Sequence, residues 1–208
     1  MIHSNPPFPV LGNSLNPEHF QLLDLSSANK QLTQIGLVKY IDEYLSKNKI
    51  GYGGYLENRT FYLDSKLFSE NLRTLHLGID LWTNAGTPMY CPWDGVVHSF
   101  ADNGNYLDYG PTIILEHNSI FGRIYSLYGH LSRESLIGLY EGKPFSRGSQ
   151  IATLGHVGEN GNWPPHLHLQ LIRDMEANYG DFPGVVEPDK KDIYTKLCPN
   201  PLALIGLS

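Results

Sequence analysis

The chain contains 208 residues, a length that suits one domain or one domain with an appended arm. Only 17% of the residues are charged, whereas glycine (21) and proline (14) are abundant, and this mixture favours short strands joined by turns over a helical bundle. The net charge of −6 argues against nucleic-acid binding, which requires a basic surface, and no apolar run approaches the roughly 18 residues that span a bilayer.

Residues 1–50 predict an arm and a helix that pack on the core, because the stretch is too short for a core of its own. The start lacks the basic and continuous apolar regions of a secretory signal peptide. We therefore expect a cytoplasmic protein, with secretion by a signal-less route as the alternative. One helix is predicted over residues 28–48, where apolar residues recur every three or four positions: Leu32, Ile35, Val38, Ile41 and Leu45.

Residues 51–175 predict the main domain, a mainly β fold with an antiparallel sheet or sandwich. Short runs rich in Val, Ile, Leu and Tyr alternate there with Gly, Pro, Asn and Asp, the residues that end strands and form turns. Residues 176–208 contain GDFPGVVEP and CPNP and predict an irregular segment that wraps over the sheet. Cys91 and Cys198 are too few for a disulfide framework, and we expect free buried thiols.

The stretch PHLHLQL at residues 165–171 alternates polar and apolar side chains. In a strand, His166, His168 and Gln170 share one face, and the leucines share the other. The pattern predicts a half-buried strand with two imidazoles side by side. An HxH motif taken alone favours a solvated strand face, and a partner elsewhere in the chain is needed to indicate a site.

The segment HLGIDLW provides partners for this pair. His76 and Asp80 are four residues apart and face the same way in a strand, with Gly78 leaving room between them. The later segment SLYGHL places His130 at the end of another strand. Catalytic zinc requires three nitrogen or oxygen ligands and an open fourth position, so the ordered combination of these segments predicts a metal site.

At these residues, over about 73–172, the sequence resembles the lysostaphin-type, or LytM-like, zinc metallopeptidases, many of which cut peptide cross-links in bacterial cell walls. The resemblance implies one zinc ion per chain, bound by His76, Asp80 and His168. It also implies that His130 and His166 form the catalytic pair. One of them would act as general base, while the other would stabilise the oxyanion or protonate the leaving amine. The resemblance leaves these two roles unassigned.

The function expected from this resemblance is zinc-dependent cleavage of a peptide or amide bond, of the peptidoglycan endopeptidase type, by a monomer. The turn GHVGENGNWPPHLH differs from the short Ser/Thr-Gly turn that is usual in the family. The strands also look similar to a metallopeptidase-like domain found between a kinase-like phosphotransferase domain and an aminotransferase domain. An intracellular amidohydrolase with a non-wall substrate therefore stays open as an alternative, as does a non-catalytic zinc-holding or substrate-binding module.

The remaining histidines and two aromatic residues near these segments are weaker candidates for the site. His117 is predicted to be a turn residue and His98 a structural strand residue. His156 lies close to the site in sequence and is a lesser candidate for lining the cleft. The aromatic residues Tyr128 and Trp163 are candidates for substrate subsites, although packing is the commoner role of such side chains.

Overall fold

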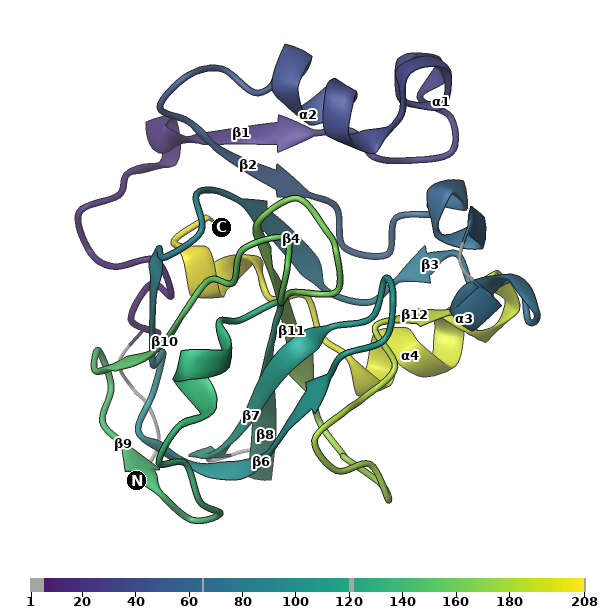
Figure 1. The fold of residues 1–208 in the computed structure, drawn as a ribbon. Coiled ribbons are helices and arrows are strands. Elements are labelled where there is room, and N and C mark those ends of the chain that lie inside the picture. The colour runs from purple at the N-terminus through teal and green to yellow at the C-terminus, as the bar shows by residue number, and fades with distance from the viewer. Residues whose placement is uncertain (1–5, 65, 120–121, 208) are drawn as a thin grey trace.

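The computed structural model describes residues 6–64, 66–119 and 122–207. A large mixed sheet dominates the described part of the chain (Figure 1), with strand order β1-β2-β4-β11-β8-β7-β6-β9. Two small sheets, β10-β5 and β12-β3, lie beside it. The strands are β1 (Phe20–Leu23), β2 (Ile50–Gly53), β3 (Leu75–His76), β4 (Ile79–Trp82), β5 (Pro88–Tyr90), β6 (Gly95–Asn103), β7 (Gly110–Ser119), β8 (Gly122–Gly129), β9 (Pro144–Phe145), β10 (Gln150–Thr153), β11 (His166–Ile172) and β12 (Val185–Val186). The predicted mainly β fold class is confirmed.

The helices are short, and the single helix predicted over residues 28–48 is wrong. Asn29 caps the first helix, its side chain accepting from the backbone N–H groups of Gln31 and Leu32. Gly36 then interrupts the helix, with φ 79° and ψ 161°, a conformation that glycine adopts at little cost. The helices are α1 (Lys30–Ile35), α2 (Leu37–Tyr44), α3 (Lys66–Ser69) and α4 (Lys191–Leu197), with 3-10 turns at Pro17–His19, Thr60–Asp64, Arg133–Leu136, Pro188–Lys190 and Leu202–Ile205. In the described part of the chain, no helix is long and apolar enough to cross a membrane.

The large sheet is covered on both faces, so its central strand β11 is buried along its whole length. On one face, Leu167, Leu169 and Leu171 join the main core together with side chains from β4, β7 and β10. On the other face, the C-terminal segment contributes Phe182 and Cys198 to a second cluster. The prediction that PHLHLQL forms a half-buried strand is therefore wrong. The polar face is buried as well, because a distant segment folds over it.

Both ends of the chain contribute to the main core. Val10 and Leu204 are fully buried in it, and the Val10 backbone N–H donates to the Leu204 carbonyl at 2.8 Å. Strand β1 forms the edge of the large sheet beside β2, with which it runs parallel. The division of the chain at residues 50 and 175 stays a prediction. Cys91 and Cys198 are free and buried, as expected.

Candidate metal centre

Strand register brings the two parts of the predicted metal site together. Strand β11 lies between β4 and β8, and its His168 pairs with Asp80 on one side and with Gly129 on the other. Directly paired residues of an antiparallel ladder lie about 4.5–5.5 Å apart at Cα. The prediction that His76 and Asp80 lie in one strand is wrong. The segment forms two strands that belong to different sheets, with the break at Leu77 and Gly78.

The ligand atoms of His76, Asp80 and His168 converge on one point. Oδ1 of Asp80 lies 3.3 Å from Nε2 of His76 and 3.1 Å from Nδ1 of His168. The two imidazole nitrogens are 3.0 Å apart. Ligands held about 2.0–2.1 Å from a tetrahedral zinc ion lie roughly 3.4 Å from one another. Two imidazoles and a carboxylate at these separations fit a zinc ion, and the described residues contain this one such group of three.

The two histidines are oriented by hydrogen bonds on the side away from the convergence point. Nδ1–H of His76 donates to the Gly54 carbonyl at 3.1 Å, which leaves the Nε2 lone pair free for a cation. Nε2–H of His168 donates to Oε1 of Gln170 at 3.0 Å, which leaves the Nδ1 lone pair free. Such partners fix the tautomer and the ring orientation of metal-binding histidines. Gln170, on the same face of β11, thus supports the neighbouring histidine.

The carboxylate of Asp80 is shared between the convergence point and a buried arginine. Its Oδ2 accepts a hydrogen bond from Arg59, whose side chain is 0% exposed. Arg59 also donates to Glu57 at 2.7 Å and to the Tyr62 hydroxyl at 2.9 Å. Burial alone would raise the pKa of Asp80, but His76 and Arg59 outweigh it and hold that pKa well below its usual range. Asp80 is therefore ionised, as a metal ligand must be.

Burial keeps the imidazole of His76 neutral at physiological pH. It lowers the pKa of His76 to about 4, and the nearby charge of Arg59 acts in the same direction. Since a histidine binds a metal through an unprotonated nitrogen, His76 is in the protonation state that a cation requires.

His130 and His166 form a second pair of imidazoles beside the ligand atoms, with ring centroids 4.2 Å apart. Nδ1–H of His130 donates to the Asn160 carbonyl at 2.9 Å, and Nδ1–H of His166 donates to the Pro164 carbonyl at 2.8 Å. Both Nε2 atoms are therefore unprotonated acceptors, and that of His166 lies 3.9 Å from Oδ1 of Asp80. Burial lowers the pKa of His166 to about 4 and that of His130 well below its usual range.

The backbone at His130 is strained. Its φ of 63° lies in the left-handed region, which a histidine rarely adopts. Two backbone hydrogen bonds hold it there: its N–H donates to Tyr109 at 2.7 Å, and its carbonyl accepts from Gly155 at 2.9 Å. Strain of this kind is typical of functional sites, where the surroundings fix a side chain in one direction.

The site lines a cavity of about 180 Å³. Asp80, His130, His166 and His168 contribute to its wall, whereas His76 lies behind them and is 0% exposed. Aromatic side chains supply much of the remaining lining: Phe61, Tyr62, Phe68, Trp82, Tyr109, Trp163 and Phe182.

Of the other histidines and aromatic residues considered from the sequence, some line the cavity and others lie elsewhere. Trp163 lines the cavity, but Tyr128 is fully buried in the main core on the opposite face of the sheet. His156 is exposed and is not part of the cavity lining. His117, predicted to be a turn residue, is instead a buried residue of β7, and its Nε2 contacts the Ser126 hydroxyl at 2.7 Å. His98 lies in β6, as expected.

Sequence reasoning missed the group behind Asp80, formed by Glu57, Arg59 and Tyr62. These residues lie in the stretch ENRTFY, outside any metal-binding motif, and a single arginine among polar residues predicts a solvated side chain. No local pattern indicates that it pairs with a carboxylate 21 residues later.

Gly78 is required by the close approach of β11. A Cβ atom at this position would lie 2.5 Å from the Leu169 carbonyl oxygen and 2.9 Å from the His168 ring. We expect Gly78→Ala to displace His168, to weaken zinc binding and to cost about 1–3 kcal/mol of stability, the usual cost of overpacking. Zinc competition titration and thermal unfolding measure both effects. The control is Gly104→Ala, whose Cβ would meet only Asp102, at 3.5 Å. Equal zinc affinities in the two variants would contradict the expectation.

Comparison with known proteins identifies the family. The model of Peptidase family M23 matches residues 74–179, half of the chain, and the match includes all five predicted site residues. The chain belongs to this family. The prediction of a metallopeptidase is thereby confirmed at the level of the family.

Individual relatives of this M23 member are distant. The peptidoglycan DD-endopeptidase ShyA of Vibrio cholerae is 32% identical over 126 residues, which cover 57% of this chain and 26% of ShyA. The chain thus spans about a quarter of the length of that relative. Among solved structures, a zinc-containing peptidase from Vibrio cholerae is 28% identical, with a TM-score of 0.39, over 51% of this chain and 31% of its own. The catalytic domain of lysostaphin from Staphylococcus simulans is 24% identical, with a TM-score of 0.38, over 57% and 79%.

Proposed function

We propose that the protein is a zinc-dependent hydrolase of peptide amide bonds. The observation that carries this proposal is the convergence of three ligand atoms from His76, Asp80 and His168 beside a second pair of neutral imidazoles in one cavity. When bound, a zinc ion supplies Lewis acidity and lowers the pKa of a coordinated water toward about 7.

The second pair of histidines moves the protons in this proposal. Amide hydrolysis adds water across the C–N bond, so one proton must leave the water and one must reach the departing amine. The Nε2 atoms of His130 and His166 are unprotonated, and either is able to accept the first proton. The other imidazole then stabilises the oxyanion as a hydrogen-bond donor or protonates the amine.

The name of ShyA supports peptidoglycan-type peptides as the substrate class. A non-catalytic zinc-holding module is the main rival function. The enzyme is favoured because both imidazoles of the second pair are retained, neutral and held by backbone carbonyls, an arrangement that metal holding alone does not require. An amide substrate outside the cell wall is compatible with the same chemistry.

The proposal predicts about one zinc ion per chain and metal-dependent turnover. We expect a chelator to abolish cleavage of peptidoglycan fragments or of glycine-rich and D-amino-acid peptides, and added zinc to restore it. The melting temperature should fall on chelation, because bound metal stabilises only the folded state. Metal analysis, melting curves and turnover of the purified protein test these points. Protein that loads zinc fully but cleaves none of these substrates would support the zinc-holding module instead.

A further inference from the structure

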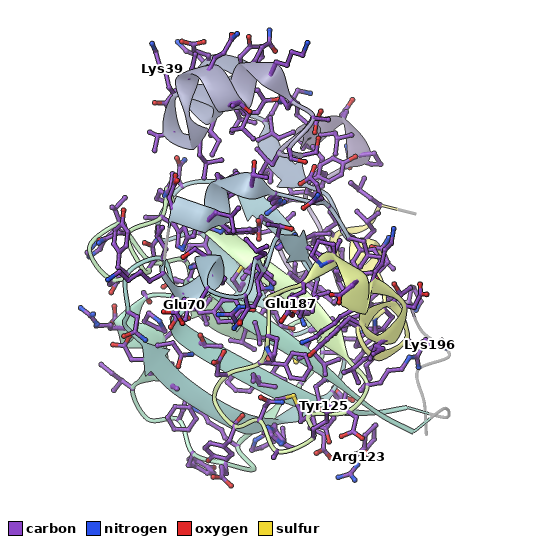
Figure 2. All side chains as sticks on the ribbon, turned by 90° about the vertical axis from the view of Figure 1, so that its right-hand side faces the viewer. Lys39, Glu70, Arg123, Tyr125, Glu187 and Lys196 are labelled. Atoms are coloured by element: carbon purple, nitrogen blue, oxygen red, sulfur yellow. The ribbon has the colours of Figure 1, made fainter. Side chains whose placement is uncertain are left out.

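Two segments that lie outside the part of the chain matched by the family model contribute to the wall of the cavity. The turn at residues 60–64 and helix α3 contribute one wall, and residues 181–185 contribute another. These walls lie near each other, since Tyr62 and Val185 belong to one hydrophobic cluster, against which Phe68 also packs. Figure 2 faces this side of the molecule, where Glu70 and Glu187 directly follow α3 and β12. These walls therefore contribute to substrate selection at the site, together with lining residues from the matched part of the chain.

The enclosure limits the size of what enters. Asp80 is 2% exposed, His168 3% and His130 5%, so the reacting bond must come into a pocket and cannot lie across an open surface. The volume of about 180 Å³ is below the roughly 300–1,000 Å³ of ordinary small-molecule pockets. A cavity of this size accommodates the end of a short chain. It suits such an end better than a strand of cross-linked polymer that continues on both sides of the cleaved bond.

Arg73 is a cation in the cavity wall, and one of its N–H donors makes no hydrogen bond among the described residues. One terminal nitrogen donates to the Leu67 carbonyl, and the guanidinium lies 5.2 Å from the centre of the Phe68 ring, so the side chain is held in place. Its Nε–H is buried and has no hydrogen-bond partner among the described residues. A buried donor without a partner is destabilising, and a bound acceptor that reaches it would remove that cost.

The nearby carboxylates do not satisfy this arginine. Asp108 and Asp181 also line the cavity. Burial raises the pKa of Asp181 and the charge of Arg73 partly opposes this, but among the described residues no ion pair of 4 Å or less joins either carboxylate to Arg73. Asp108 accepts from the Tyr109 N–H and from Asn105, and Asp181 accepts from the Phe182 N–H. The guanidinium therefore stays available to an anionic group of a ligand, and its planar donors match a carboxylate.

We propose that the cavity binds the C-terminal end of a short peptide, with the peptide's free carboxylate on Arg73 and the scissile carbonyl beside Asp80 and His166. This inference rests on the proposed amide hydrolysis and narrows its substrate class to small carboxylate-terminated peptides. Hydrolysis there consumes one water, breaks one C–N bond close to the C-terminus and releases an amine and a carboxylate.

The test compares paired peptides that differ only at the C-terminus, as a free acid or as a primary amide, with the zinc-loaded protein. We expect wild type to favour the acid by about 10- to 100-fold in kcat/KM, the range of a hydrogen bond to a charged group. Arg73→Gln should lose this preference while it still cleaves the amide slowly. Arg123→Gln is the matched control, because Arg123 is exposed and lies at the far edge of the face in Figure 2.

The outcomes separate this inference from the proposed function. Equal cleavage of acid and amide by wild type overturns the carboxylate site but leaves amide hydrolysis intact, whereas no cleavage of any peptide by zinc-loaded protein contradicts amide hydrolysis itself. Should Arg73→Gln fold poorly, the acid-to-amide ratio of wild type and that of Arg73→Lys still decide the point. Insoluble cross-linked peptidoglycan provides a further arm. Its cleavage at the same rate per bond as soluble peptides would show that the cavity opens to polymer and would overturn the size limit.

Discussion

His168→Ala is expected to abolish metal binding, whereas His166→Ala is expected to keep the metal and lose most turnover. His168 places Nδ1 at the convergence point, 3.1 Å from Asp80, so its removal leaves only His76 and Asp80 as ligands. The nearest nitrogen of His166 lies 3.9 Å from Asp80 and is free for substrate or water. Its loss should lower turnover by about 10²–10⁴-fold, the usual contribution of a general acid or base.

Zinc content, melting temperature and kcat/KM of each variant distinguish these roles. His130→Ala should behave as His166→Ala does, because the two rings are neighbours with the same pattern of backbone hydrogen bonds. His156→Ala is the control, since that exposed histidine is not part of the cavity lining. Zinc lost from His166→Ala but retained by His168→Ala would reverse the assignment. Equal losses of stability without loss of zinc would assign both residues to packing.

The sequence predicts the candidate site better than it predicts the surroundings of the site. The period-two alternation around His166 and His168 predicts which side chains share a face, because strand geometry alone determines it. Burial of that face depends on Phe182 and Cys198, which come from a segment with no regular pattern. Alternation in one strand carries no information about what covers it, so the enclosed cavity is visible only in the structure.

Two errors in element boundaries have the same physical origin, namely glycine. The backbone turns at Gly36 and divides the predicted helix in two. The prediction missed this break because the apolar stripe continues on both sides of the glycine. At Gly78, alternation also continues on both sides, yet His76 and Asp80 belong to different sheets. Hydrophobic periodicity detects side-chain faces, whereas the breaks arise from backbone freedom that periodicity does not measure.

Substitution of Arg59 is expected to lower the free energy of unfolding more than any other change considered. In metal-free protein, Arg59→Met removes the cation between two carboxylates and leaves Asp80 and Glu57 as charges without their partner. Breaking a buried ion pair from one side costs about 3–5 kcal/mol. The same substitution at Arg133, whose ion pair with Asp102 is exposed, should cost at most about 1 kcal/mol and is the matched control.

Urea unfolding of metal-free protein measures this difference, and a second substitution tests its cause. If uncompensated charge is the reason, Arg59→Met combined with Glu57→Gln should cost less than the sum of the two single changes, because the double variant retains one unpaired charge fewer. Zinc should restore part of the stability lost in Arg59→Met, since a bound cation replaces the guanidinium as the partner of Asp80. A loss of less than about 0.5 kcal/mol, the range of ordinary surface substitutions, would show that Asp80 does not depend on Arg59. A loss that zinc leaves unchanged would instead place the role of Arg59 in packing against Phe61 and Tyr62, whose rings its guanidinium contacts.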